Sequence, residues 1–223
     1  MESTENRTLV IAHAGCEHTV PGSAENLRRA AACGADVIEM DLQFFEGEVY
    51  LAHDPVSAAN RGELLTLDQA FDLLQDTPVR FNCDLKTAET MPEVVRIADA
   101  HGLLDRVIFT GEYTPKAQPD TAGYHHFRNT EHLGIVAPHE PITREKALRL
   151  IDAFQNAADR TLEAYNIEYT TLTEEAAALF ARAGVPVCCW TVDDPERLQR
   201  LIRQGIYAVT TNLLQKAYEV RGN

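Results

Sequence analysis

Charged residues spaced two positions apart occur in two short apolar stretches of the N-terminal half. Glu39 and Asp41 occupy the first stretch, and Asp84 and Lys86 occupy the second. Residues i and i+2 of a β-strand point to the same face, so each pair would share one face. Carboxylates that converge repel one another unless a hard divalent cation such as Mg2+ or Ca2+ binds between them. The spacing therefore predicts a metal site formed by the three acids. Lys86 would meet a substrate phosphate as a point charge.

Two histidines lie at the ends of other apolar runs. His13 ends the run LVIAH, and His53 precedes Asp54-Pro55. Histidine gains or loses a proton near neutral pH, so such a pair suits general acid and general base catalysis. Simpler interpretations stay open for each signal: acids that face solvent, a plain Asp–Lys ion pair, and structural histidines.

These residues need a scaffold, and the apolar pattern predicts one. Short runs rich in Val, Ile, Tyr and Phe alternate with helical patterns, which indicates βαβ units and a parallel sheet. The run at 49–53 follows its predecessor too closely for a crossover helix, so we interpret it as a hairpin partner or an extension of that strand. Eight strands remain, which favours a closed (β/α)8 TIM barrel over a doubly wound sheet, because no Gly-rich phosphate loop follows the first strand. The predicted strands, hairpin partner included, cover 9–13, 36–42, 49–53, 79–86, 106–111, 124–127, 162–169, 185–192 and 207–212.

Helical patterns fill the gaps between most of these strands. Ser23 and Thr66 are predicted N-caps of the first two helices, and Gly34 is predicted to end the first. The segment 111–132 is irregular and is predicted to form a long active-site loop. Its three histidines are predicted to be ordinary surface residues: His125, His126 and His132. The whole chain, 1–223, is expected to be a single domain.

Composition narrows the possible partners and the compartment. The chain has 223 residues and a formal net charge of −14, which disfavours nucleic acid and anionic membranes as partners. Its 5 cysteines have no metal-binding spacing, and we see no signal peptide, so free thiols in the cytoplasm are expected. No apolar run approaches the roughly 20 residues of a membrane span. A small molecule is the expected partner, and the oligomeric state is not specified.

The order of these motifs resembles the glycerophosphodiester phosphodiesterase family. The Glu-x-Asp followed by His-Asp-Pro is quite specific for that family, and the Trp-Thr-Val near the penultimate strand supports it. The similarity spans nearly the whole chain, in IAHAG at 11–15, AEN at 24–26, GADVIEMDLQ at 34–43, LAHDP at 51–55, LTLDQAFDLL at 65–74, CDLK at 83–86 and CCWTVDDPERLQRLIRQG at 188–205.

The resemblance implies a TIM barrel of the phospholipase C-like phosphodiesterase type. It implies a phosphoric diester hydrolase that cleaves glycerophosphodiesters to glycerol 3-phosphate and an alcohol, as part of lipid metabolism. By motif, Glu39, Asp41 and Asp84 would hold Mg2+ or Ca2+, and His13 and His53 would be the acid–base pair. Substrate contacts would come from Lys86 and Trp190, and Glu25 and Asn26 would support the first His loop.

Several positions depart from the family pattern. Ala14 stands where the family usually has an Arg that helps to hold the phosphate. The third carboxylate is Asp84 in place of Glu, and the family's Thr-Asp near the last strand reads Thr211-Asn212. The insertion after His-Asp-Pro is short, which suggests a more open site. Two alternatives therefore stay open: a catalytically reduced phosphodiester-binding barrel, and a lyase of the sphingomyelinase D type.

Overall fold

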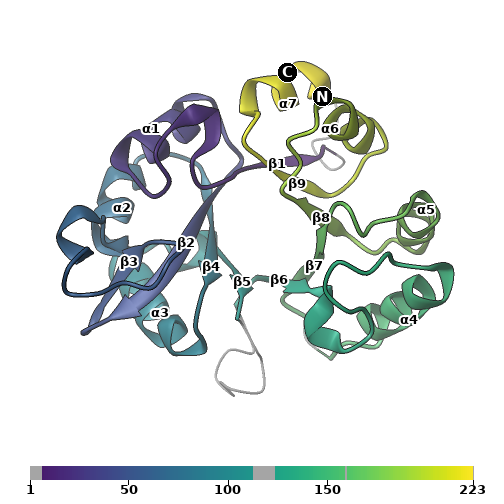
Figure 1. Cartoon of the computed structure of the whole chain (residues 1–223), viewed down its shortest axis with the longest axis horizontal. Coiled ribbons are helices and arrows are strands. Elements are labelled where there is room, and N and C mark those ends of the chain that lie inside the picture. Colours follow the sequence, from purple (N-terminus) through teal and green to yellow (C-terminus); the bar gives the residue numbers. More distant parts are fainter. Residues whose placement is uncertain (1–6, 113–123, 159, 223) are drawn as a thin grey trace.

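A closed barrel of parallel strands forms the centre of the computed structural model, which describes residues 7–112, 124–158 and 160–222 (Figure 1). The strands follow the order β1-β9-β8-β7-β6-β5-β4-β2, and pairing of β1 with β2 closes the ring. The predicted TIM barrel is thereby confirmed. The barrel strands are β1 (Leu9–Ala12), β2 (Val37–Phe45), β4 (Arg80–Leu85), β5 (Val107–Gly111), β6 (His126–Asn129), β7 (Leu162–Glu168), β8 (Val187–Trp190) and β9 (Ala208–Thr211).

The remaining strand, β3 (Glu48–Leu51), pairs antiparallel with the end of β2, as the short connection predicted. Its register joins Phe45 to Glu48 across a two-residue loop. Both loop residues, Glu46 and Gly47, have positive φ, the conformation of the tight hairpin turns that match strand twist. This hairpin carries the chain from Asp41 directly to His53.

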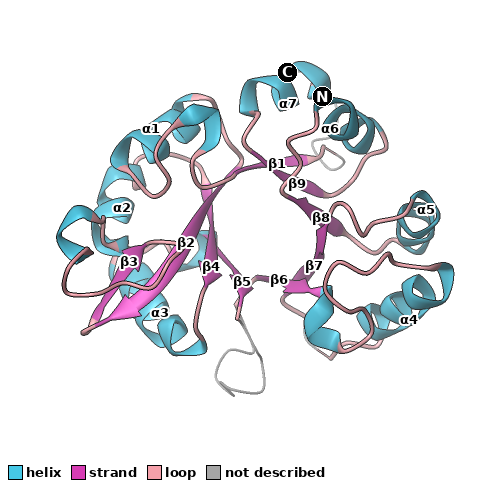
Figure 2. Ribbon diagram, viewed as in Figure 1, coloured by secondary structure: helices cyan, strands magenta, loops and turns pink. Residues whose placement is uncertain are grey.

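Helices surround the barrel as an outer layer (Figure 2). The Ser23 side chain caps the first helix by accepting from the backbone N–H of Asn26, and Gly34 follows its end in the left-handed conformation. Thr66 and Gln69 form a reciprocal capping box on the second helix. The helices are α1 (Ala24–Ala32), α2 (Leu67–Leu74), α3 (Met91–Ala100), α4 (Arg144–Gln155), α5 (Glu174–Ala183), α6 (Pro195–Arg203) and α7 (Leu214–Arg221).

Apolar side chains form two separate cores. The larger core lies between the strands and the helices and includes Ile38, Met40 and Leu42. The smaller core fills the barrel with one residue from each of seven strands: Ile11, Val37, Ile108, Phe127, Ala164, Cys188 and Ala208. Alternation along β2 thus sends its even-numbered residues outward and its odd-numbered ones inward, which directs Glu39 and Asp41 into the barrel.

One expectation about the segment 111–132, the surface position of His126, is corrected. Residues 126–129 form β6 inside the barrel wall, and His126 is fully buried there, not on the surface. His125 is partly exposed, and its Nδ1 lies 2.7 Å from Glu163 Oε1. The part predicted as an active-site loop at 113–123 lies outside the described residues. Within the described chain, no helix is both long and apolar enough to cross a bilayer.

Candidate active site

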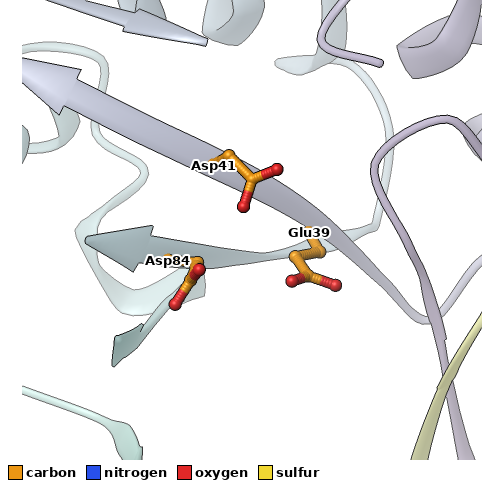
Figure 3. Close-up of side chains that lie close together, drawn as sticks. All are labelled: Glu39, Asp41 and Asp84. Atoms are coloured by element: carbon orange, nitrogen blue, oxygen red, sulfur yellow. The ribbon is translucent and has the colours of Figure 1, made fainter. Parts of the chain in front are cut away.

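Three carboxylates converge inside the C-terminal end of the barrel (Figure 3). Glu39 and Asp41 come from β2, and Asp84 comes from β4, directly opposite Asp41 in the strand register. One oxygen from each lies within 4.8 Å of the other two. The C-terminal end of the strands is where barrel enzymes build their sites. The structure therefore brings the three predicted acids together.

The carboxyl of Glu39 is in an unfavourable position for a charge. Burial raises its pKa well above the ordinary value, and the neighbouring Asp84 and Asp41 raise it further. Among the described residues, its Oε2 is buried and has no hydrogen-bond partner. A buried acceptor without a partner is costly, so this oxygen indicates a ligand that the protein chain itself does not provide.

Lys86 provides a counter-charge for the other two acids. Its Nζ lies 2.6 Å from Asp41 Oδ1 and 2.5 Å from Asp84 Oδ2. Burial alone would lower the pKa of this ammonium, but the charges of Asp84 and Asp41 outweigh burial and raise it to about 12. Lys86 is therefore a fixed positive charge, held at the carboxylate cluster with 20% of its side chain exposed.

Neighbours on β4 and β5 fix the position of Asp84. The Thr110 hydroxyl donates to a pair of oxygens, Asn82 Oδ1 at 2.9 Å and Asp84 Oδ1 at 3.1 Å. Gly111 follows with a φ of 76°, and a Cβ there would overlap Asp84 Oδ1 and the backbone oxygen of Leu85. Only glycine allows the strand to pass this close to the carboxylate.

His13 lies in the loop that leaves β1. Its Nδ1 lies 3.1 Å from Oδ1 of Asn212, which follows β9. Asn26 supports this loop from α1, because its Nδ2 donates to Thr19 Oγ1 at 3.0 Å and contacts Cys16 Sγ at 3.5 Å. Glu25, in contrast, is exposed on the same helix.

His53 lies at the rim, after β3, with 73% of its side chain exposed. Together with Glu39, Asp41 and Ala14, it lines a small cavity of about 20 Å³. Ala14 is buried and lines the same cavity as Glu39 and Asp41. His53, the second predicted histidine, therefore borders the same cavity as two of the three acids.

Trp190 ends β8, opposite Glu168 in the register of the strands. Its indole Nε1–H is buried and, within the described residues, has no acceptor. Three polar residues around the site were not predicted from the sequence: Asn82, Thr110 and Asp193. Asn82 lies two residues before Asp84 on β4, Thr110 lies near the end of β5, and Asp193 lies just beyond β8. No motif distinguishes these residues from ordinary polar residues.

Fold and site together define a TIM barrel with an acidic cluster at its C-terminal end and His53 in the cavity beside it. No family model matches the chain. A curated relative named glycerophosphodiester phosphodiesterase, from Caldanaerobacter subterraneus subsp. tengcongensis, is 25% identical over 92% of this chain and 94% of its own length. The chain therefore resembles that family along almost its entire length.

Solved structures show the same fold. A putative glycerophosphoryl diester phosphodiesterase from Agrobacterium tumefaciens superimposes with a TM-score of 0.77 at 17% identity, covering 96% of this chain and 97% of that one. A glycerophosphodiester phosphodiesterase from Thermotoga maritima gives 0.73 at 18%, covering 96% and 98%. A phosphodiesterase from Oleispira antarctica, solved with the product sn-glycerol-3-phosphate, gives 0.72 at 18%, covering 97% and 98%.

Proposed function

We propose that this protein is a metal-dependent phosphoric diester hydrolase that cleaves glycerophosphodiesters to glycerol 3-phosphate and an alcohol. The observation that carries the proposal is the convergence of Glu39, Asp41 and Asp84 at the C-terminal end of the barrel. The name of the curated relative and the product bound by the Oleispira antarctica neighbour support this substrate class.

The donor set fits a divalent cation. All three candidate ligands are carboxylates, the hard oxygen donors that Mg2+ and Ca2+ prefer. The buried, unpartnered Oε2 of Glu39 fits the same conclusion, because a cation would satisfy it. When bound, the cation would supply positive charge that stabilises the phosphate oxygens as the diester is cleaved.

The side chains around the cluster fit the remaining steps. His13 and His53 would exchange protons with the attacking oxygen and the leaving oxygen. Lys86 would hold a phosphate oxygen, and the Trp190 ring would line the pocket for the glycerol group. Asn26 would support the His13 loop. Glu25 is exposed on the same helix, so we propose only a supporting role for it near that loop.

The absence of Arg at position 14 leaves fewer charges to bind phosphate. Ala14 supplies only a methyl group to the cavity beside Glu39. Lys86 then carries more of the phosphate binding, and its contacts with two carboxylates must rearrange when substrate enters. We infer weaker binding of the phosphate group than an additional Arg would give.

Two further proposals concern organisation. We propose that residues 1–223 act as one domain. In the described part of the chain, the first and last strands, β1 and β9, pair with each other within a single sheet. We also propose a cytoplasmic location, which is supported by five unpaired cysteines.

The test is a screen of glycerophosphodiesters with Mg2+, Ca2+ and Mn2+, scored by release of glycerol 3-phosphate. EDTA should abolish turnover, and His13→Ala should lower kcat by roughly 10²–10⁴-fold. His132→Ala is the matched control, because His132 is exposed and has no role in the proposed chemistry. Turnover that survives both EDTA and His13→Ala would refute the metal and acid–base assignments. Binding of diesters without any turnover would instead favour a binding barrel.

A further inference from the structure

A chain of hydrogen bonds connects His13 to the other end of the sequence. Besides the 3.1 Å contact between His13 Nδ1 and Asn212 Oδ1, the backbone N–H of His13 donates to Thr211 O at 3.1 Å. Asn212 Nδ2 in turn donates to Asp193 Oδ2 at 2.6 Å, and its backbone N–H donates to Asp193 Oδ1 at 2.8 Å. Asp193 therefore holds Asn212 by two bonds, and Asn212 contacts the imidazole.

The donor and acceptor properties of these groups fix the direction of each hydrogen bond in this series. An ionised carboxylate only accepts hydrogen bonds, so the amide nitrogen of Asn212 must face Asp193. The amide oxygen must then face His13. Because an amide oxygen also only accepts, His13 Nδ1 must carry the proton. In the neutral imidazole Nε2 is then the acceptor.

We propose that Asp193 and Asn212 are positioning residues, which hold neutral His13 in the Nδ1–H tautomer and leave Nε2 as the atom that exchanges protons during the reaction. The inference rests on the proposed function only in giving His13 an acid–base role. When Nε2 takes up a proton, the imidazolium still donates from Nδ1 to Asn212, so the ring keeps its orientation in both protonation states. A neutral amide can orient the ring in this way without adding a negative charge beside it.

The location of these hydrogen bonds supports a positioning role of Asp193 and Asn212 over a purely structural one. Asp193 is exposed, and barrel closure is already provided by the β1–β9 ladder, which pairs residues 9–12 with residues 208–211. The carboxylate of Asp193 makes its contacts to Asn212 and, at 3.3 Å, to the hydroxyl of Thr211. These contacts orient the residue that meets His13.

The first experiment reads the tautomer without substrate. Protein labelled with ¹⁵N-histidine is studied by long-range ¹H–¹⁵N NMR, and the His13 signals are assigned with His13→Gln. We expect the Nδ1–H form in the unsubstituted protein and loss of this single form in Asn212→Ala and Asp193→Ala. Asp194→Ala is the control: Asp194 caps α6 through Arg197 N at 2.7 Å and lies outside the chain of bonds, so the tautomer should not change. An Nε2–H form in the unsubstituted protein, or a tautomer unaffected by Asn212→Ala, would overturn the inference.

The second experiment exchanges the two side chains. In the double variant Asp193→Asn/Asn212→Asp, the carboxylate at 212 can accept from both His13 Nδ1–H and the amide at 193, so the Nδ1–H tautomer should return. We expect each alanine variant to lose about 10- to 100-fold in kcat with little change in KM. This loss is below the roughly 10⁴-fold cost of a wrong tautomer in the serine-protease triad, because a neutral, partly exposed amide orients the ring here. The exchange should restore kcat to within about 10-fold of the original value.

The two readouts separate this inference from the proposed function. If the tautomer behaves as expected but no diester is cleaved, the positioning chain is supported and the proposed function fails. If diesters are cleaved but the tautomer ignores Asn212 and Asp193, the positioning inference fails alone. A double variant that keeps the kcat of the alanine variants would also refute the inference.

Discussion

Glu39→Gln offers a test in which stability and metal binding move in opposite directions. In the folded protein without metal, burial and two neighbouring carboxylates raise the pKa of Glu39 well above its ordinary value. The folded state then binds this proton more tightly than the unfolded state does, so its contribution to stability is lost as the pH rises through the raised pKa. A neutral amide at position 39 removes that pH dependence and the repulsion from Asp41 and Asp84.

The magnitude follows from the buried, unpartnered Oε2 of Glu39. Leaving a buried polar atom without a partner costs about 1–3 kcal/mol, and the amide of a glutamine can donate to the adjacent carboxylates. In EDTA at about pH 8, Glu39→Gln should therefore be more stable by about 1–3 kcal/mol. For a chain of this size, that corresponds to a rise in Tm of roughly 2–12 °C. The difference should shrink as the pH falls below about 4, where Glu39 is protonated in both states.

Saturating metal should reverse the order of stability. Cation binding at 100-fold above its Kd adds about 2.7 kcal/mol to the original protein, whereas the variant lacks one ligand. Differential scanning fluorimetry in EDTA and then in Mg2+, Ca2+ or Mn2+ measures both effects. Glu145→Gln makes the same chemical change on the exposed surface of α4 and should respond as the original protein does. A variant that is destabilised in EDTA, or equal stabilisation of both proteins by metal, would refute this reasoning.

Two other predictions follow from the ion pairs and the thiols. Lys86→Met should destabilise the metal-free protein by about 3–5 kcal/mol, because two partly buried carboxylates lose their counter-charge. In a thermal melt, added metal should recover much of this loss. An unchanged Tm would contradict the ion-pair geometry. In a titration of the native protein with a thiol reagent, Cys33 should react first, because it is the partly exposed cysteine. The other four cysteines are buried, and burial raises the pKa of the Cys16 thiol, for example, to about 11. All 5 thiols should react after denaturation, and rapid reaction of a second one in the native protein would contradict this burial.

Features that depend on local spacing could be predicted from the sequence. The alternation along β2 placed Glu39 and Asp41 inward, and the caps at Ser23 and Thr66 follow from their own neighbours. The helix α7 was not predicted, because its N-cap position is Leu213 and no side chain caps it. Without a polar N-cap, the sequence carries no start signal there.

Features that depend on distant contacts could not be predicted. The burial of His126 depends on β6, a short strand whose register with β7 shifts between His126 and Phe127. The bond between His13 and Asn212 joins residues 199 positions apart, and no periodicity reports such a contact. In the sequence, Asn212 stands out only as a departure from the family pattern, although its side chain contacts the predicted catalytic residue His13.

Closure of the ring between β1 and β9 has a consequence for the order of events during synthesis. The carboxylate cluster and Lys86 come from residues 39–86, which leave the ribosome early, whereas the partner of His13 comes from residue 212. Pairing between segments this far apart in the chain is slow, because a long loop must close before any contact forms. A nascent chain can therefore assemble its acidic cluster long before His13 acquires its orientation. Full activity should therefore appear only when the final strand is in place and Asn212 contacts His13.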